Sequence, residues 1–206
     1  MVRKIRIAVL ASGRGSNFEA IINAIKSGTC NAQISLLITN NPDSGAAQIA
    51  IKNGIKVENV IKSDFKKRED LDLKIKSLLD ENKVELVVLA GYMLLIKNKE
   101  LLQSYKNRII NIHPSLLPAF PGENAQEQAF NYGSKISGFT IHFVDQTLDG
   151  GAIIYQESVD ISNCKNAQEV CDLILEHEHT GYPYVIDLFS KGKFEINGRF
   201  VRFIKG

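Results

Sequence analysis

The sequence lacks a long hydrophobic run and has few cysteines. No stretch approaches the ~18 apolar residues that a membrane-spanning helix needs. The apolar stretch after residues 1–6 is interrupted at residues 12–15, too early for a secretory signal peptide. Cys30, Cys164 and Cys171 are an odd number without Cys-x-x-Cys spacing, which argues against a disulfide framework and a zinc site. We therefore expect a cytoplasmic protein without a bound metal.

An excess of charge of one sign is also missing. The chain has 25 basic and 23 acidic residues, a formal net charge of +2, and the two signs are interleaved. This balance gives no electrostatic reason to expect a nucleic-acid partner. With 206 residues, 44% of them hydrophobic, the chain fits a single globular domain that can bury its own core.

The first half of the chain alternates apolar runs with segments of helical period. This alternation is typical of βαβ units and a parallel sheet. We expect strands at 5–10, 33–39, 57–61 and 84–90, and helices at 17–27, 44–53 and 66–82. Gly28 and Gly54 follow two of these helices and are typical C-terminal stops. The prediction is an α/β fold with a doubly wound, mostly parallel open sheet, whose ligand crevice lies beyond the carboxyl ends of the strands.

The second half has a different pattern. A short strand at 109–112 leads into a loop that contains Pro114, Pro118 and Pro121, which prevent a helix there. Two β-rich segments, 136–144 and 152–159, can form an antiparallel pair. A long helix is expected at 167–190, and the Asn197-Gly198 pair between alternating apolar residues predicts a hairpin at the end of the chain.

The first strand-to-helix turn reads Ser-Gly-Arg-Gly-Ser-Asn at 12–17. Backbone amides and the positive end of a helix can hold an anion at such a turn. Phe18 stands where a dinucleotide fingerprint has its third glycine, so a lone phosphate fits better than NAD. The alternative is a tight turn in which Ser16 or Asn17 caps the helix.

Three residues are candidates for catalysis. Asn111 and His113 lie two positions apart at the end of a strand, so their side chains can face the same side. An amide beside an imidazole suits a reaction in which negative charge builds on a carbonyl oxygen. Asp149 precedes two glycines and can support a protonated His113 if the fold brings them together. A structural histidine and a turn-capping aspartate are the alternatives.

Two further groups of residues are weaker candidates. The run Glu-His-Glu-His at 176–179 lacks the spacing of a zinc helix, and successive positions on a helix face different directions. One of these four residues can face a site while the others lie at the surface. His142 lies in an apolar strand and can equally be a hydrogen-bonded core residue or a functional one.

Together, these motifs resemble those of the folate-dependent formyltransferases. The resemblance rests on Asn-Ile-His-Pro-Ser-Leu-Leu-Pro at 111–118, His-Phe-Val at 142–144 and Leu-Asp-Gly-Gly at 148–151, which occur in the order and spacing of that family. Leu-Ala-Ser-Gly-Arg-Gly-Ser-Asn at 10–17 narrows it to the phosphoribosylglycinamide formyltransferase family. The similarity extends from about residue 5 to residue 190.

The resemblance implies transfer of a formyl group from 10-formyltetrahydrofolate, as co-substrate, to the amine of glycinamide ribonucleotide in purine biosynthesis. It implies that Asn111, His113 and Asp149 are catalytic. By the same resemblance, the ribonucleotide is bound by Gly15, Ser16, Asn17 and Glu178. The residues implied for folate binding are Arg68, Met93, Leu94, Leu95, Ile96, Asn111 and Asp145.

Two positions depart from the family pattern. Leu94 stands where some bacterial members have an arginine, and Gln126 where several relatives have a histidine. The resemblance also leaves other functions open: formyltetrahydrofolate hydrolase, another folate-dependent formyltransferase, or a non-catalytic nucleotide-binding module. We expect a monomer or homodimer with one domain over residues 1–206: a phosphate-binding half at 1–110, a catalytic and folate-binding half at 111–190, and a hairpin at 191–206.

Overall fold

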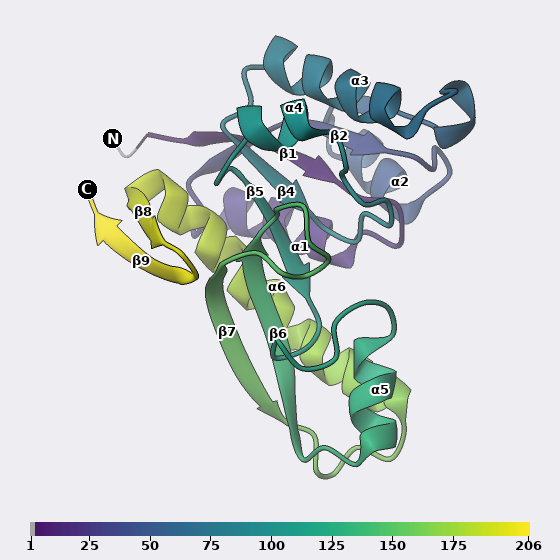
Figure 1. Cartoon of the computed structure of the whole chain (residues 1–206), viewed down its shortest axis with the longest axis vertical. Coiled ribbons are helices and arrows are strands. Elements are labelled where there is room, and N and C mark those ends of the chain that lie inside the picture. The colour runs from purple at the N-terminus through teal and green to yellow at the C-terminus, as the bar shows by residue number, and fades with distance from the viewer. Residues whose placement is uncertain (1–2) are drawn as a thin grey trace.

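The computed structural model describes residues 3–206. Its main sheet has seven strands, and a two-stranded hairpin follows (Figure 1). The strands of the main sheet are β1 (Ile5–Leu10), β2 (Ala32–Thr39), β3 (Val57–Asn59), β4 (Leu86–Leu89), β5 (Ile109–His113), β6 (Ile136–Phe143) and β7 (Ile153–Asp160). The helices are α1 (Ser16–Ser27), α2 (Gly45–Lys52), α3 (Arg68–Glu81), α4 (Lys99–Ser104), α5 (Ala125–Tyr132) and α6 (Ala167–Lys191), with a short 3₁₀ turn η1 (Lys62–Asp64).

The sheet has the strand order β3-β2-β1-β4-β5-β6-β7. The pairs from β3 to β5 are parallel, while β5–β6 and β6–β7 are antiparallel. Both the doubly wound parallel part and the antiparallel strands of the second half are therefore confirmed. The chain order reverses between β1 and β4, and sheets of this kind bind ligands beyond the carboxyl ends of the strands at that point.

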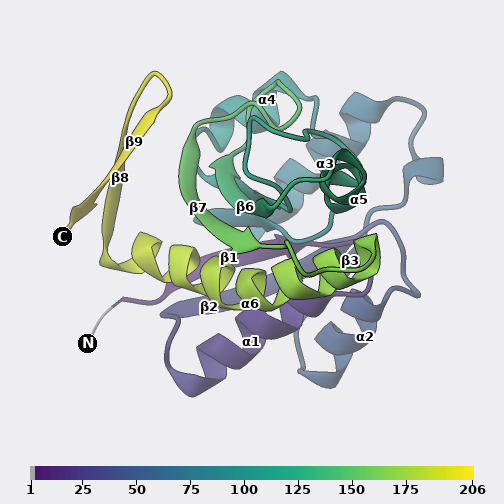
Figure 2. The ribbon, with the colours of Figure 1, turned by 90° about the horizontal axis from the view of Figure 1, so that it is seen from below.

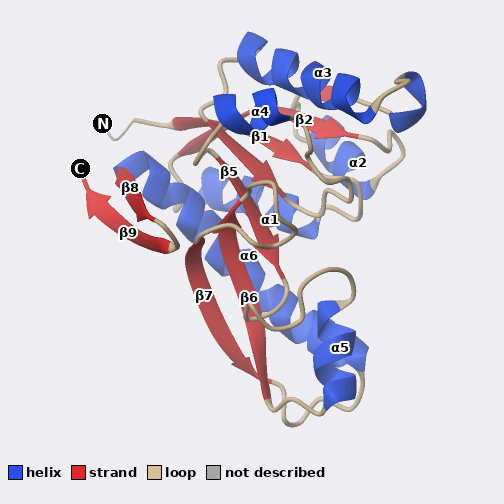
Figure 3. Cartoon of the chain, in the orientation of Figure 1, coloured by secondary structure: helices blue, strands red, loops and turns tan. Residues whose placement is uncertain are grey.

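Helices cover the sheet on both faces (Figures 2 and 3). Alternate residues of one strand enter different cores, because successive side chains of a strand point to opposite faces. Ile7 and Val9 belong to a core shared with α1, α2 and α6. Ala8 and Leu10 belong to a core shared with α3 and α4. We call these the α6-side core and the α3-side core.

Two helices, α4 and α5, were not predicted. Both are short, with six and eight residues, so hydrophobic periodicity has little length in which to show. Asn98 caps α4, since its side chain accepts a hydrogen bond from the Leu101 amide at 3.0 Å. The predicted strands β3 and β4 are shorter than expected, and Gly28 ends α1 in the left-handed conformation as predicted.

The chain ends in the predicted hairpin, formed by β8 (Gly192–Asn197) and β9 (Phe200–Lys205). Asn197 pairs with Phe200, so the turn consists of Gly198 and Arg199, with Gly198 at φ 60°. The hairpin packs through Phe194 and Ile196 against the α6-side core. Within residues 3–206, no helix has the length and apolar character needed to cross a membrane.

Candidate active site

Strand β5 places Asn111 and His113 on the same face of the sheet. Ile110 and Ile112 alternate with them and enter the α6-side core, so the two polar side chains face the opposite side. His113 is 4% exposed. The prediction that both side chains face the same side is therefore confirmed, and the strand extends one residue beyond the predicted 109–112 to include His113.

His142 lies directly opposite Asn111 in the β5–β6 pairing. Its Nδ1 is 2.8 Å from the Phe143 carbonyl oxygen, which can only accept, so Nδ1 carries the proton. Burial lowers the pKa of His142, which favours the neutral ring. Nε2 is then an acceptor, and the Asn111 amide nitrogen lies 3.3 Å from it. His142 thereby fixes Asn111 with one N–H occupied and the second N–H available to another acceptor.

The two ring nitrogens of His113 face acceptors. Nδ1 is 3.5 Å from Oδ2 of Asp149, and Nε2 is 2.8 Å from the Phe120 carbonyl oxygen. A protonated imidazole donates from both nitrogens and so matches this pair of acceptors. Asp149 Oδ2 also accepts a hydrogen bond from the Gly122 amide at 2.8 Å, which ties it to the proline-containing loop.

Asp149 reaches His113 from the loop between β6 and β7. Asp149 itself has φ 49°, a left-handed conformation that is uncommon outside glycine. The following glycines are needed for a different reason, close approach. A Cβ on Gly151 would lie 1.7 Å from the Phe143 carbonyl oxygen, and one on Gly150 would lie 2.1 Å from Oγ1 of Thr147.

The turn between β1 and α1 requires a glycine at position 15, because the backbone there lies close to α2. Gly15 has φ 84°, and a Cβ there would lie 2.7 Å from Cα of Ala46 in α2. No side chain of the described residues caps α1, so neither Ser16 nor Asn17 has the capping role considered as the alternative. The first amides of α1 are thus free of a side-chain acceptor at an end where the helix dipole is positive.

Glu178 joins α6 to this turn. The Asn17 side-chain nitrogen donates to Oε2 of Glu178 at 2.8 Å. Glu178 is 6% exposed, and burial raises the pKa of its carboxyl to about 7, against a smaller lowering by Asn17. Of the run at 176–179, Glu178 is therefore the residue that faces the turn.

The segment after β4 contains the residues expected to bind folate. It begins beside β5, because Leu89 pairs with Asn111, and beside the β1–α1 turn, because the Ser12 amide donates to the Gly91 carbonyl oxygen at 3.1 Å. Met93 and Leu95 are exposed, Leu94 packs against the α3-side core, and Ile96 is buried in it. Arg68 lies beneath the segment and donates from Nη2 to the Leu95 carbonyl oxygen at 2.6 Å.

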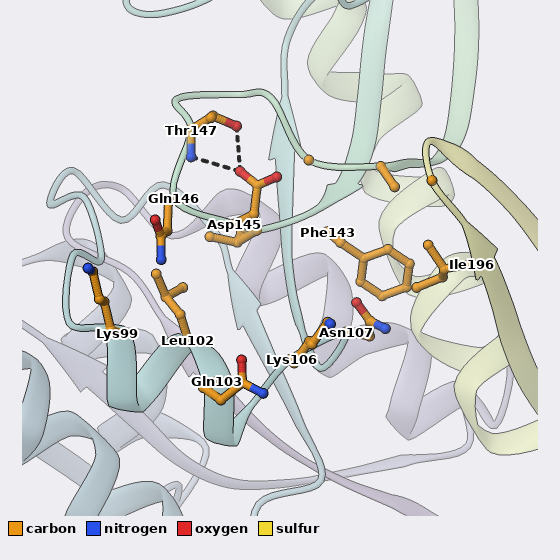
Figure 4. A pocket seen from close by; sticks show the side chains of 14 residues that line it. Lys99, Leu102, Gln103, Lys106, Asn107, Phe143, Asp145, Gln146, Thr147 and Ile196 are labelled. Atoms are coloured by element: carbon orange, nitrogen blue, oxygen red, sulfur yellow. Dashed lines mark hydrogen bonds between the residues drawn. The ribbon is translucent and has the colours of Figure 1, made fainter.

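Asp145 supports its own loop. Its Oδ1 accepts a hydrogen bond from the Thr147 amide at 2.8 Å. On this outer side of the loop lies a cavity of about 560 Å³ between α4 and the β8–β9 hairpin (Figure 4). Its lining, among residues 3–206, does not include Asn111, His113 or Asp149.

The remaining candidates lie apart from these groups. His177 Nδ1 is 2.6 Å from Oε1 of Glu157. Gln126 is half-buried near the start of α5. In the described part of the chain, no three His, Cys, Asp or Glu side chains gather where they could hold a metal ion.

Taken together, the arrangement suits acyl-type transfer. A free amide N–H from Asn111 and a ring held by a carboxylate can stabilise an oxyanion, while the nearby helix end can hold an anionic substrate. Sequence reasoning left the role of His142 open. The signal that identifies it is register, since only pairing between β5 and β6 puts it opposite Asn111.

Comparison with known proteins agrees with this chemistry. The formyl transferase family matches residues 5–186. The chain is 40% identical over 181 residues to phosphoribosylglycinamide formyltransferase of Bacillus subtilis, covering 88% of this chain and 92% of that protein. A solved structure of glycinamide ribonucleotide transformylase 1 from Symbiobacterium toebii superposes with a TM-score of 0.94 at 38% identity, over 98% of this chain and 95% of that one.

A second kind of relative is much longer. The chain is 34% identical over 193 residues to the trifunctional purine biosynthetic protein adenosine-3 of Gallus gallus, and the match covers 94% of this chain but 19% of that protein. The chain thus spans about a fifth of the length of this relative. By sequence and by structure, the chain belongs to the formyl transferase family and, within it, to the phosphoribosylglycinamide formyltransferases.

Proposed function

We propose that the chain transfers the formyl group of 10-formyltetrahydrofolate to the amine of glycinamide ribonucleotide. The products are formylglycinamide ribonucleotide and tetrahydrofolate, a step of de novo purine biosynthesis. The observation that carries this proposal is the meeting of Asn111, His113 and Asp149 on one face of the sheet, next to a helix start suited to a phosphate.

In this reaction the substrate amine attacks the formyl carbon and a tetrahedral oxyanion forms. The free N–H of Asn111 donates to that oxygen, and the charge of protonated His113 stabilises it. Asp149 supports the imidazolium and accepts the proton that the amine loses, through water, before the carbon–nitrogen bond to folate breaks and the folate nitrogen is protonated. No metal takes part in this scheme.

The two substrates approach from different sides. The ribonucleotide phosphate is bound by the amides of Gly15, Ser16 and Asn17, and Glu178 holds the ribonucleotide from α6. The folate lies between the segment 93–96 and the loop 145–149, where backbone groups read the pterin. Leu94 contributes backbone and packing, so the absence of an arginine there leaves folate binding intact.

The test is absorbance-monitored transfer from a 10-formyl folate to glycinamide ribonucleotide, with the amine omitted as a control. We expect turnover that needs the amine and is lost in Asp149→Asn. Asn111→Ala removes one oxyanion donor and should lower kcat by about 10²–10³. Deformylation without the amine would identify a hydrolase instead, and binding without any turnover would identify a nucleotide-binding module.

We further infer that the protein acts in the cytoplasm as a monomer or homodimer on small molecules alone. Its three cysteines are all free, as expected for a reducing compartment. Light scattering across a range of protein concentrations decides the oligomeric state. A stable assembly larger than two chains would contradict this inference.

A further inference from the structure

We infer that Asp72 is a positioning residue for the folate donor and that Arg68 acts through it, by holding the 93–96 segment in shape. This inference rests on the proposed function. It adds a residue that no motif points to, and it gives Arg68 a role different from direct ligand contact.

Asp72 is a buried carboxylate that links α3 to the residues just before α4. Its relative exposure is 0%. Oδ2 accepts hydrogen bonds from the backbone amides of Lys97 at 2.7 Å and Asn98 at 2.9 Å. These amides end the 93–96 segment and start α4. A buried carboxylate is costly unless its oxygens are bonded, so these bonds fix the chain direction at the end of the segment.

Arg68 fixes the middle of the same segment. It lies one helical turn before Asp72, and its Nη2 is 3.1 Å from Oδ1 of Asp72. The same Nη2 donates to the Leu95 carbonyl oxygen at 2.6 Å. Asp72 and Arg68 therefore hold residues 95, 97 and 98 from a single face of α3. We call this arrangement the α3 clamp.

The segment held by the α3 clamp has no regular secondary structure to define its shape. Residues 92–98 form neither helix nor strand. Met93 and Leu95 point outward with 68% and 52% exposure, while Ile96 is anchored in the core. If backbone groups of this segment read the pterin, their positions depend on the α3 clamp. Tyr92 lies next to it, since Arg68 and Asp72 both influence its pKa, which burial raises to about 12.

The test replaces Asp72 by asparagine, which keeps the shape but loses the charge and presents an N–H₂ group toward Arg68 or the two amides. We expect KM for the formyl folate to rise about tenfold, with KM for glycinamide ribonucleotide and kcat within about twofold of the unmodified protein. Arg68→Met should have a similar effect, and the double variant should be no worse than either single one, because both break the same arrangement.

A matched control is Lys76→Met. Lys76 pairs with Asp80 at 2.9 Å with the same i,i+4 spacing on α3, but neither residue contacts the 93–96 segment within the described chain. It should leave both KM values unchanged. A second measurement needs no substrate: hydrogen exchange of the Lys97 and Asn98 amides should accelerate in Asp72→Asn and not in Lys76→Met.

The outcomes separate the two proposals. Unchanged exchange at residues 97 and 98, an unchanged KM for the formyl folate, or equal rises of both KM values would overturn the positioning role of Asp72. Additive effects of Asp72→Asn and Arg68→Met would show that Arg68 acts on the ligand by itself and would overturn its role here. Absence of turnover in the unmodified protein would contradict the proposed function and this inference with it. If the unmodified protein turns over but Asp72→Asn leaves the ratio of KM for the formyl folate to KM for glycinamide ribonucleotide unchanged, this inference alone would be contradicted.

Discussion

At the scale of the residue, the two histidines of the site have different partners. His142 is kept neutral by burial and turns its Nε2 toward Asn111. His113 instead lies between a carboxylate and a carbonyl oxygen. These two histidines lie on neighbouring strands, and their hydrogen-bond partners distinguish them. The sequence does not reveal those partners.

Removing the acceptor of His142 should impair the chemistry more than binding. In His142→Phe, the Asn111 amide loses the partner that orients it, so we expect kcat to fall by about tenfold to a hundredfold, less than removal of the donor itself. KM for both substrates should change little. His142→Gln, which retains an acceptor, should recover part of the loss in steady-state kinetics. Equal losses in both variants would contradict an orienting role.

Glu178 should make stability depend on pH. Its pKa is about 7 when folded, above the ~4.3 of a free glutamate, so the folded state holds an extra proton between these values. The extra proton adds to the free energy of unfolding. This contribution is complete below the unfolded pKa and is lost as pH rises through the folded pKa of about 7, a change on the order of 3 kcal/mol. Glu178→Gln should remove this dependence and be relatively more stable at pH 8 than at pH 5.

Denaturant unfolding at the two pH values measures this effect. Glu176→Gln is the matched control, because Glu176 is exposed on the same helix. It should follow the pH dependence of the unmodified protein. If Glu178→Gln follows it too, the carboxyl of Glu178 is not protonated in the fold at neutral pH.

At the scale of the element, turns decide where the site lies. The β1–α1 turn depends on Gly15 both for its positive φ and for the contact with α2. The β6–β7 loop depends on Asp149 in a left-handed conformation and on glycines packed against Phe143 and Thr147. A contact with a distant helix thus requires Gly15, whereas contacts within the β6–β7 loop and with the end of β6 require its glycines.

Gly15→Ala should weaken binding of the ribonucleotide phosphate in the proposed function, beyond its effect on stability. The left-handed conformation costs about 1–2 kcal/mol for a residue with a Cβ, and the Cβ must also displace α2. Gly28→Ala is the control, since Gly28 has φ 78° and no atom of the described chain within 4 Å of a Cβ. Both variants should lose stability in thermal unfolding, but only Gly15→Ala should raise KM for glycinamide ribonucleotide, by about tenfold or more. A rise in both would point to a general loss of stability.

Elements differ in how well the sequence predicts them. The parallel strands and the long helix α6 follow from period and apolar runs, because each has enough residues to show its pattern. The helices α4 and α5 do not, and the clamp formed by Asp72 depends on packing between α3 and a loop far along the chain. Alternation along β5 predicted that Asn111 and His113 share a face. The approach of Asp149 to them required the loop geometry.

At the scale of the whole molecule, the sheet separates two cores, and each lies beside a different ligand region of the proposed function. The α6-side core contains Phe18 of α1 and Ala46 of α2, next to the β1–α1 turn. The α3-side core contains Leu71 and Ile96, and Leu94 packs on it. Each substrate region in the proposed function is therefore supported by its own set of buried side chains.

A matched pair of substitutions tests this division. Ile21 in α1 and Ile75 in α3 are both fully buried, one in each core. Replacing either by alanine should cost about 2–5 kcal/mol of stability. At a temperature where both variants stay folded, Ile21→Ala should mainly raise KM for the ribonucleotide and Ile75→Ala mainly KM for the formyl folate. Indistinguishable KM changes would show that the cores act as one unit.

The alternation of side chains along β1 and β4 has a consequence for how such enzymes diversify. The thickness of the sheet separates a substitution in the α6-side core, beneath the β1–α1 turn, from the segment 93–96, and it equally separates a substitution in the α3-side core from that turn. If the two regions respond separately, acceptor preference and donor preference can change independently, with Asn111, His113 and Asp149 kept at the shared edge. A fold partitioned in this way can exchange the molecule that receives the one-carbon unit and keep the molecule that delivers it.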